Sequence, residues 1–80
     1  MTDIPTISFR VLIQRVKRLG FTPVRQKGSH IRYVHKDGRK TTVPDHGSQD
    51  VPKGLLIKII KQDLQISVDD FIRYKMDMFI

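Results

Sequence analysis

The sequence predicts an α+β fold: a two-layer α-β-β-β-α domain with a three-stranded antiparallel sheet and a short C-terminal helix. Two stretches, residues 9–19 and 52–63, carry apolar side chains at helical spacing. Between them, residues 21–44 contain three short segments with strand-type composition, separated by turn residues. Two amphipathic helices and a sheet with one apolar face bury those surfaces together when both helices pack on the same side of the sheet.

The first helix is predicted over residues 9–19 by a single apolar stripe. Its members follow i, i+3, i+4, i+7 and i+10 spacing: Phe9, Leu12, Ile13, Val16 and Leu19. Ser8 provides a side chain that can cap the N-terminus, and Gly20 can end the helix in the left-handed conformation.

Three strands are predicted over residues 21–26, 30–35 and 39–44. Gly28 and Ser29 turn the chain between the first two strands, and Lys36-Asp37-Gly38 does so between the second and the third. In the first strand Val24 is expected to point toward the core, while Pro23 indicates a position at the edge of the sheet.

The length of the second turn decides which strand residues face each other. A two-residue Asp-Gly turn would mix polar and apolar side chains on both faces of the sheet. A three-residue turn pairs Ile31 with Val43 and Tyr33 with Thr41, and collects the apolar side chains on one face. The other face then carries His30, Arg32, Val34, Lys40 and Thr42. We favour this register, which leaves His30 on the face away from the core.

The C-terminal part is predicted to form two helices. Pro52 suits the first turn of the second helix, over residues 52–63, which is expected to bury Leu55, Leu56, Ile59 and Ile60. Ser67 is the expected N-cap of a short last helix, with Asp69 and Asp70 in its first turn and Phe71 docked on the core. The apolar tail MDMFI (residues 76–80) either covers the core or contacts a partner.

Length and composition exclude several classes of protein. Eighty residues make one domain, expected to span residues 1–80, with one small core. The absence of cysteine excludes disulfides and thiolate metal sites. The N-terminal residues have no apolar leader segment and no apolar run is long enough to span a bilayer, so we expect a soluble, cytoplasmic protein without membrane contact.

Positive charge is concentrated in the first half of the chain. The sequence has 15 Lys and Arg against 8 Asp and Glu, a net charge of +7. Residues 1–40 contain ten cations and two acids, whereas residues 41–80 contain five cations and six acids. A localised basic field is typical of a protein that binds a polyanion, so nucleic acid is the favoured partner. The cationic face of the first helix is either a solvated face or a surface that follows an RNA backbone (Arg10, Lys17, Arg18).

Four motifs together resemble the HicA toxin family, whose fold is like that of a double-stranded-RNA-binding domain. They are GF-x-x-VRQKGSH (20–30), DGR…TVP-x-H (37–46), KG-x-L…I-x-K (from 53) and IS-x-DDF (66–71). The resemblance implies a small endoribonuclease toxin (an mRNA interferase) that cleaves messenger RNA with one histidine and no metal or other cofactor, and that a HicB antitoxin silences. His30 matches the catalytic position. In one departure, Gln65 stands where similar proteins end the second helix with glycine.

The residues around His30 support such chemistry. The RNA 2′-hydroxyl is an internal nucleophile, so the enzyme needs a base that titrates near neutrality and cations that stabilise the phosphorane. Imidazole, with an unperturbed pKa of about 6.5, is suited to act as that base. Gly28 permits close approach of the backbone to a ligand, and Ser29 can donate to a phosphate oxygen. The expected RNA-binding cations are Arg25, Lys27, Arg32 and Lys40. A single histidine predicts a slow nuclease.

The other two histidines are less informative. His35 is expected at the end of the second strand, exposed to solvent. His46 follows Pro44 in a loop that can border the site, so it is a possible accessory acid, along with Lys27 and solvent. A metal site formed by His30, His35, His46 and Asp45 is disfavoured, because residues five apart in a strand point to opposite faces.

Two other functions remain open on the sequence. The basic half could dock structured RNA without cleaving it, as a non-catalytic binding module, with His30 a bystander. The chain could instead be an adaptor for an acidic protein, with the apolar tail as its contact.

Overall fold

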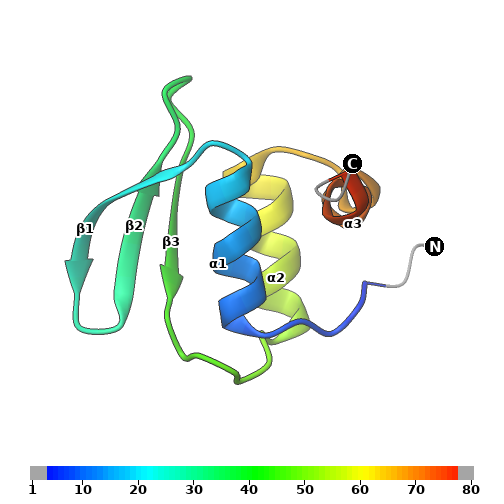
Figure 1. Ribbon diagram of the computed structural model, residues 1–80, viewed down its shortest axis with the longest axis horizontal. Coiled ribbons are helices and arrows are strands. Elements are labelled where there is room, and N and C mark those ends of the chain that lie inside the picture. The colour runs from blue at the N-terminus through cyan, green and yellow to red at the C-terminus, as the bar shows by residue number, and fades with distance from the viewer. Residues whose placement is uncertain (1–3, 78–80) are drawn as a thin grey trace.

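The computed structural model describes residues 4–77, and for residues 73–77 the backbone alone. The elements in chain order are α1 (Phe9–Arg18), β1 (Thr22–Lys27), β2 (His30–Val34), β3 (Lys40–Pro44), α2 (Lys53–Lys58), η1 (Ile59–Leu64) and α3 (Val68–Asp77). The strands form one antiparallel sheet in the order β1-β2-β3, and the helices lie together beside it, with α3 on the far side of α1 and α2 (Figure 1). The predicted α+β class and three-stranded sheet are confirmed.

Helix α1 forms as its apolar stripe and caps predict. The side-chain oxygen of Ser8 accepts a hydrogen bond from the backbone N–H of Val11 at 3.2 Å, and Leu12 and Val16 are fully buried. After the helix, Gly20 has a φ of +104°, in the left-handed region. A Cβ at this position would lie 2.9 Å from Nε2 of His35, so the close approach of that ring also requires glycine.

The registers of the strands confirm the three-residue turn. Ile31 pairs with Val43 and Tyr33 pairs with Thr41, and Tyr33, Thr41 and Val43 are buried under the helices. The expectation for Val24 is wrong: the register shifts between Pro23 and Arg25, and Val24 in that bulge is 59 % exposed. The extra residue turns the side chain of Val24 out of the alternation that the sequence pattern assumes.

The second helix starts in the α conformation and ends in the π conformation. Lys53–Lys58 is α-helical, and Ile59–Leu64 continues as a π-helical turn. Leu56, Ile59 and Ile60 are buried as predicted, and Leu55 is half-buried. The helix ends at Gln65, the one non-glycine residue with positive φ in the described part of the chain (φ +58°). The carbonyl oxygen of Ile60 accepts from the amides of both Gln65 and Ile66.

Gln65→Gly is expected to stabilise the protein by about 0.5–1 kcal/mol. A non-glycine residue in the left-handed region carries a steric cost at Cβ that glycine does not, and this gain exceeds the greater flexibility of the unfolded glycine chain. Urea denaturation of both proteins measures the difference. Gln62→Gly, at a helical position of the same segment, is the control and is expected to destabilise by about 1 kcal/mol. A Gln65→Gly protein less stable than the parent would contradict the prediction.

Helix α3 packs on the core through Phe71, as predicted. The N–H of Asp70 donates to the side-chain oxygen of Ser67 at 3.0 Å, and Phe71 is 1 % exposed. The Phe71 ring covers the guanidinium of Arg15, whose Cζ lies 4.9 Å from the ring centroid. Arg15 is itself only 3 % exposed, and burial lowers its pKa. The tail, for which we expected a core or partner contact, lies outside the described side chains.

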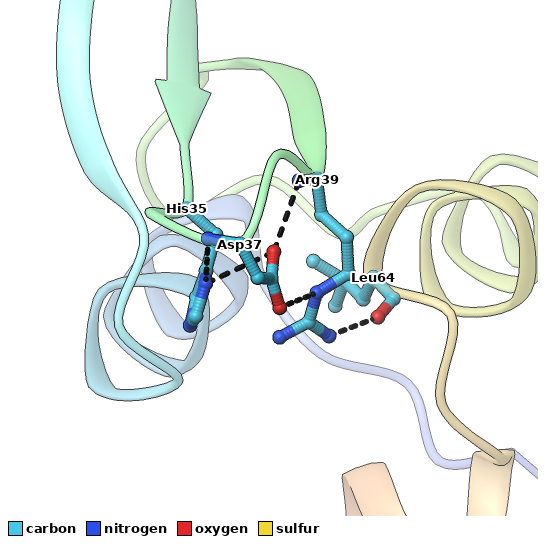
Figure 2. A network of polar contacts seen from close by, with 4 residues as sticks. All are labelled: His35, Asp37, Arg39 and Leu64. Carbon is cyan, nitrogen blue, oxygen red and sulfur yellow. Dashed lines mark hydrogen bonds and ion pairs between the residues drawn. The ribbon is translucent and has the colours of Figure 1, made fainter.

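The tip of the β2–β3 hairpin is tied to the end of η1 by a polar network (Figure 2). The carboxylate of Asp37 accepts from the backbone N–H of Arg39 at 3.0 Å and from its side-chain Nε at 2.8 Å. The guanidinium of Arg39 also donates to the carbonyl oxygen of Leu64. The expectation that His35 is solvated is wrong: its side chain is 15 % exposed and packs edge-on against Phe21, with ring centroids 5.1 Å apart. Nδ1 of His35 accepts from the N–H of Asp37 at 3.1 Å.

Asp37→Asn is expected to destabilise the protein at neutral pH and progressively less as the pH falls. The backbone N–H of Arg39, and next its side chain, hold the pKa of the Asp37 carboxyl below its usual value. A lowered pKa contributes stability above the usual pKa of the group, and this contribution is lost as the pH falls through the lowered value. Urea denaturation of both proteins between about pH 7 and about pH 2 measures the change. A difference that stays constant across this range would contradict the prediction.

Candidate functional site

The loop that precedes β2 is a two-residue turn that presents His30 at the end of the sheet. Lys27 pairs with His30 across this turn, and Gly28 at its first central position has a φ of +60°. Glycine at this position suits the type II′ hairpin turn. The side-chain amide of Gln26 donates to the carbonyl of Gly28 at 3.0 Å and braces the turn. His30 is exposed, on the face of the sheet away from the helices, as predicted.

The register surrounds His30 with cations. Lys27 lies directly opposite His30 on β1, and directly opposed side chains have Cβ atoms about 4.5–5.5 Å apart. Arg25 lies diagonally across, and Arg32 follows His30 by two residues on the same face of β2. These four residues and Thr42 of β3 line one shallow depression of about 150 Å³.

The three cations of this depression have no partner among the residues that the structure describes. Within the described chain, no hydrogen bond or ion pair involves the side chain of Arg25, Lys27 or Arg32. Arg25 also lies directly opposite Arg32 in the register of β1 and β2, and like charges in opposed strand positions are destabilising. A local conflict that costs stability without an internal compensation is typical of a ligand site. The depression is therefore suited to an anion.

The other predicted site residues lie around this depression. Gly28 and Ser29 form the turn above it, where the carbonyl of Ser29 accepts from the N–H of Asp45 at 2.7 Å. Lys40 lies two residues before Thr42, in a neighbouring groove of about 300 Å³ between β3 and α2. Arg32 and Thr42 line both hollows.

His46 lies in the loop after β3, apart from the lining of the His30 depression. Its ring stands edge-on to that of Phe9, with centroids 5.1 Å apart, and its side chain is exposed. Pro44, two residues earlier, pairs with His30 as expected. Across residues 4–77, as far as their side chains are described, no group of three or more His, Asp or Glu side chains is arranged to hold a metal ion.

The comparison with protein families identifies the chain. Residues 9–63 match the family model described as the HicA toxin of bacterial toxin-antitoxin. The chain belongs to the HicA toxin family. The match runs from the start of α1 into η1 and contains His30 and its cations, whereas α3 lies beyond it. A search of curated proteins found no match to this HicA-family chain. None of the described helices is both long enough and apolar enough to cross a membrane.

Three residues at these hollows were not singled out from the sequence. Thr42 was assigned to the correct face by strand alternation, and that alternation already placed it beside Arg32. Lys58 and Asp63 come from the second helix, and only the packing of α2 and η1 against β3 brings them to the groove. No local sequence signal indicates that proximity.

Proposed function

We propose that this HicA-family toxin is a metal-independent endoribonuclease that cleaves messenger RNA with His30 as its general acid-base. The observation that carries the proposal is the exposed imidazole of His30 in one depression with Arg25, Lys27 and Arg32, which have no partner among the described residues. The family, which is that of toxins of bacterial toxin-antitoxin systems, supports the same role.

The proposed reaction uses the nucleophile that RNA itself supplies. His30 takes the proton of the 2′-hydroxyl, the 2′-oxygen forms a bond to phosphorus, and the bond from phosphorus to the 5′-oxygen breaks. The leaving 5′-oxygen takes a proton from a general acid or from water, so the products are a 2′,3′-cyclic phosphate and a 5′-hydroxyl. Arg25, Lys27 and Arg32 hold the phosphate and stabilise the charge that develops on it.

Two side chains are candidates to donate that last proton. Lys27 lies directly opposite His30 and shares its depression, whereas His46 lies in the flanking loop against Phe9. In the proposed mechanism, Gly28, which has no Cβ, lets the backbone approach the phosphate, and the hydroxyl of Ser29 donates to a phosphate oxygen. Lys40 extends the cationic surface beyond Arg32.

The partners of this chain follow from its family and charge. A toxin of a toxin-antitoxin pair needs a protein that silences it, and we propose a HicB-like antitoxin in the same cytoplasm. Messenger RNA is the proposed substrate, and a protein with a net charge of +7 attracts its phosphates. The proposed reaction requires no cofactor.

Cleavage of a single-stranded RNA by the purified protein in EDTA tests the proposal. We expect cleavage that is unaffected by EDTA, products with 2′,3′-cyclic phosphate ends, and no cleavage of the same sequence as 2′-O-methyl RNA. Binding without cleavage would establish the non-catalytic module instead, and cleavage that EDTA abolishes would reject the mechanism. Expression in bacteria adds a cellular readout, because a nuclease is expected to arrest growth whereas a binder is tolerated.

A further inference from the structure

The groove between β3 and α2 is a second hollow, next to the depression of His30. It has a volume of about 300 Å³ and joins the depression of His30 through their shared residues Arg32 and Thr42. A chain that runs across the open face from His30 over Arg32 therefore enters this groove next.

The lining of the groove combines an apolar floor with a cationic rim. Leu55 and Ile59 line it from the second helix, half-buried and buried respectively. Lys40 of β3 and Lys58 of α2 add two cations to Arg32, and within the described chain neither lysine has a hydrogen bond or an ion pair. An apolar surface suits the face of a nucleobase, and the cations suit a phosphate.

Among the described residues of this lining, Asp63 is the one acid. Its Oδ2 accepts a hydrogen bond from the hydroxyl of Thr41 at 2.9 Å, which fixes the side chain. A fixed carboxylate next to an apolar floor can accept hydrogen bonds from the N–H groups of a base edge, but it repels phosphate. Base and phosphate would thus occupy different parts of the groove: the base by Leu55 and Asp63, the phosphate by Lys40 and Lys58.

We propose that this groove binds a nucleotide of single-stranded RNA adjacent to the phosphate held at His30. The base of this nucleotide leaves the base stack and packs on Leu55, and the phosphate on its other side lies at Lys58. The proposal rests on the proposed function for the position of the neighbouring phosphate. It favours single-stranded over duplex RNA, because a base paired and stacked in a duplex cannot enter a hollow of the protein.

Binding of a fluorescent 2′-O-methyl RNA octanucleotide, measured by anisotropy over a range of salt concentrations, tests the groove. This RNA has no free 2′-hydroxyl, so its affinity is measurable whether or not the protein is a nuclease. Lys58→Ala is expected to weaken binding about fivefold, as for one partly screened ion pair, and to reduce the salt slope by about 0.7. The matched control is Lys61→Ala, an exposed lysine of η1 outside the groove, which is expected to leave both values unchanged.

A second pair of variants tests the apolar floor. Leu55→Ala is expected to weaken binding of the single strand severalfold without changing the salt slope, because it removes an apolar contact with the base and no charge. Ile57→Ala, at a 37 % exposed position of the same helix, is the control, and thermal unfolding of both variants separates loss of the groove from loss of the fold. Equal effects of Lys58→Ala and Lys61→Ala, or wild-type binding of duplex RNA as tight as of the single strand, would overturn the proposal. If Lys58→Ala weakens RNA binding but the protein cleaves no natural RNA, the groove proposal is supported and the proposed nuclease activity is rejected.

Discussion

The His30→Ala protein is expected to cleave RNA about 10²–10⁴ times more slowly than the parent, the range that general acid-base catalysis contributes. Its affinity for 2′-O-methyl RNA is expected to be nearly unchanged, because the cations of the depression supply the binding. His30 is exposed and lies at the first position of β2, so its removal leaves the buried core intact. Single-turnover cleavage and anisotropy on the same preparation measure the two effects.

Two further variants make this result specific. His46→Ala is expected to lower the rate only if His46 protonates the leaving 5′-oxygen, and by less than His30→Ala. Lys61→Ala, which changes a cation outside both hollows, is expected to cleave RNA at the parental rate. A purified His30→Ala protein that still cleaves RNA at the parental rate would remove the catalytic assignment, and loss of binding together with cleavage would assign His30 to binding.

Phe71→Ala is expected to destabilise the protein by about 3–5 kcal/mol, the usual cost of removing a buried aromatic side chain. Phe71 is 1 % exposed and covers the buried guanidinium of Arg15, so the variant loses both apolar burial and a cation-π contact. Small domains have total stabilities of about 5–15 kcal/mol, and a loss of this size consumes a large part of that. Urea denaturation measures the change. A loss below about 1 kcal/mol would show that α3 contributes little to the fold.

The cation-π contact between Arg15 and Phe71 can be measured as a coupling free energy in a double-mutant cycle. Nη1 of Arg15 has no hydrogen-bond partner among the described residues, and a buried charge without full hydrogen bonding contributes little net stability. Arg15→Met is therefore expected to change the free energy of unfolding by less than about 1 kcal/mol. In the Arg15→Met background, Phe71→Ala is expected to cost less than in the parent, because no guanidinium is left uncovered. If Phe71→Ala costs the same free energy of unfolding in the parent and in the Arg15→Met background, the cation-π account is contradicted.

Much of the fold was predictable from the sequence because local and tertiary preferences agree. The register of β2 and β3 followed from one criterion, that Ile31, Tyr33 and Val43 share a face, and a shift by one residue would expose all of them. The caps at Ser8 and Ser67 followed from side-chain chemistry and position, whereas the end of the second helix at Gln65 was indicated only by the family resemblance. The same register placed His30 on the open face, so its exposure and cationic neighbours were also predictable.

The wrong predictions concern positions where packing overrides the local pattern. Val24 alternates correctly for a regular strand, but the bulge next to Pro23 adds a residue that no periodicity indicates. His35 was predicted to be solvated because it ends a strand, whereas the glycine at position 20 leaves room for its ring against Phe21. The groove was missed for a third reason: its residues come from β2, β3 and the second helix, and only the fold brings them together.

The bond from Arg39 to the carbonyl of Leu64 joins the tip of the β2–β3 hairpin to the end of η1. One wall of the groove belongs to this hairpin and the other to α2 and η1, so this hydrogen bond links the two elements that form the walls. For the RNA substrate proposed above, this surface is already shaped, so we expect the protein to lose little conformational entropy on binding. The proposed antitoxin would meet the same linked surface, and we expect it to neutralise the toxin by covering that surface.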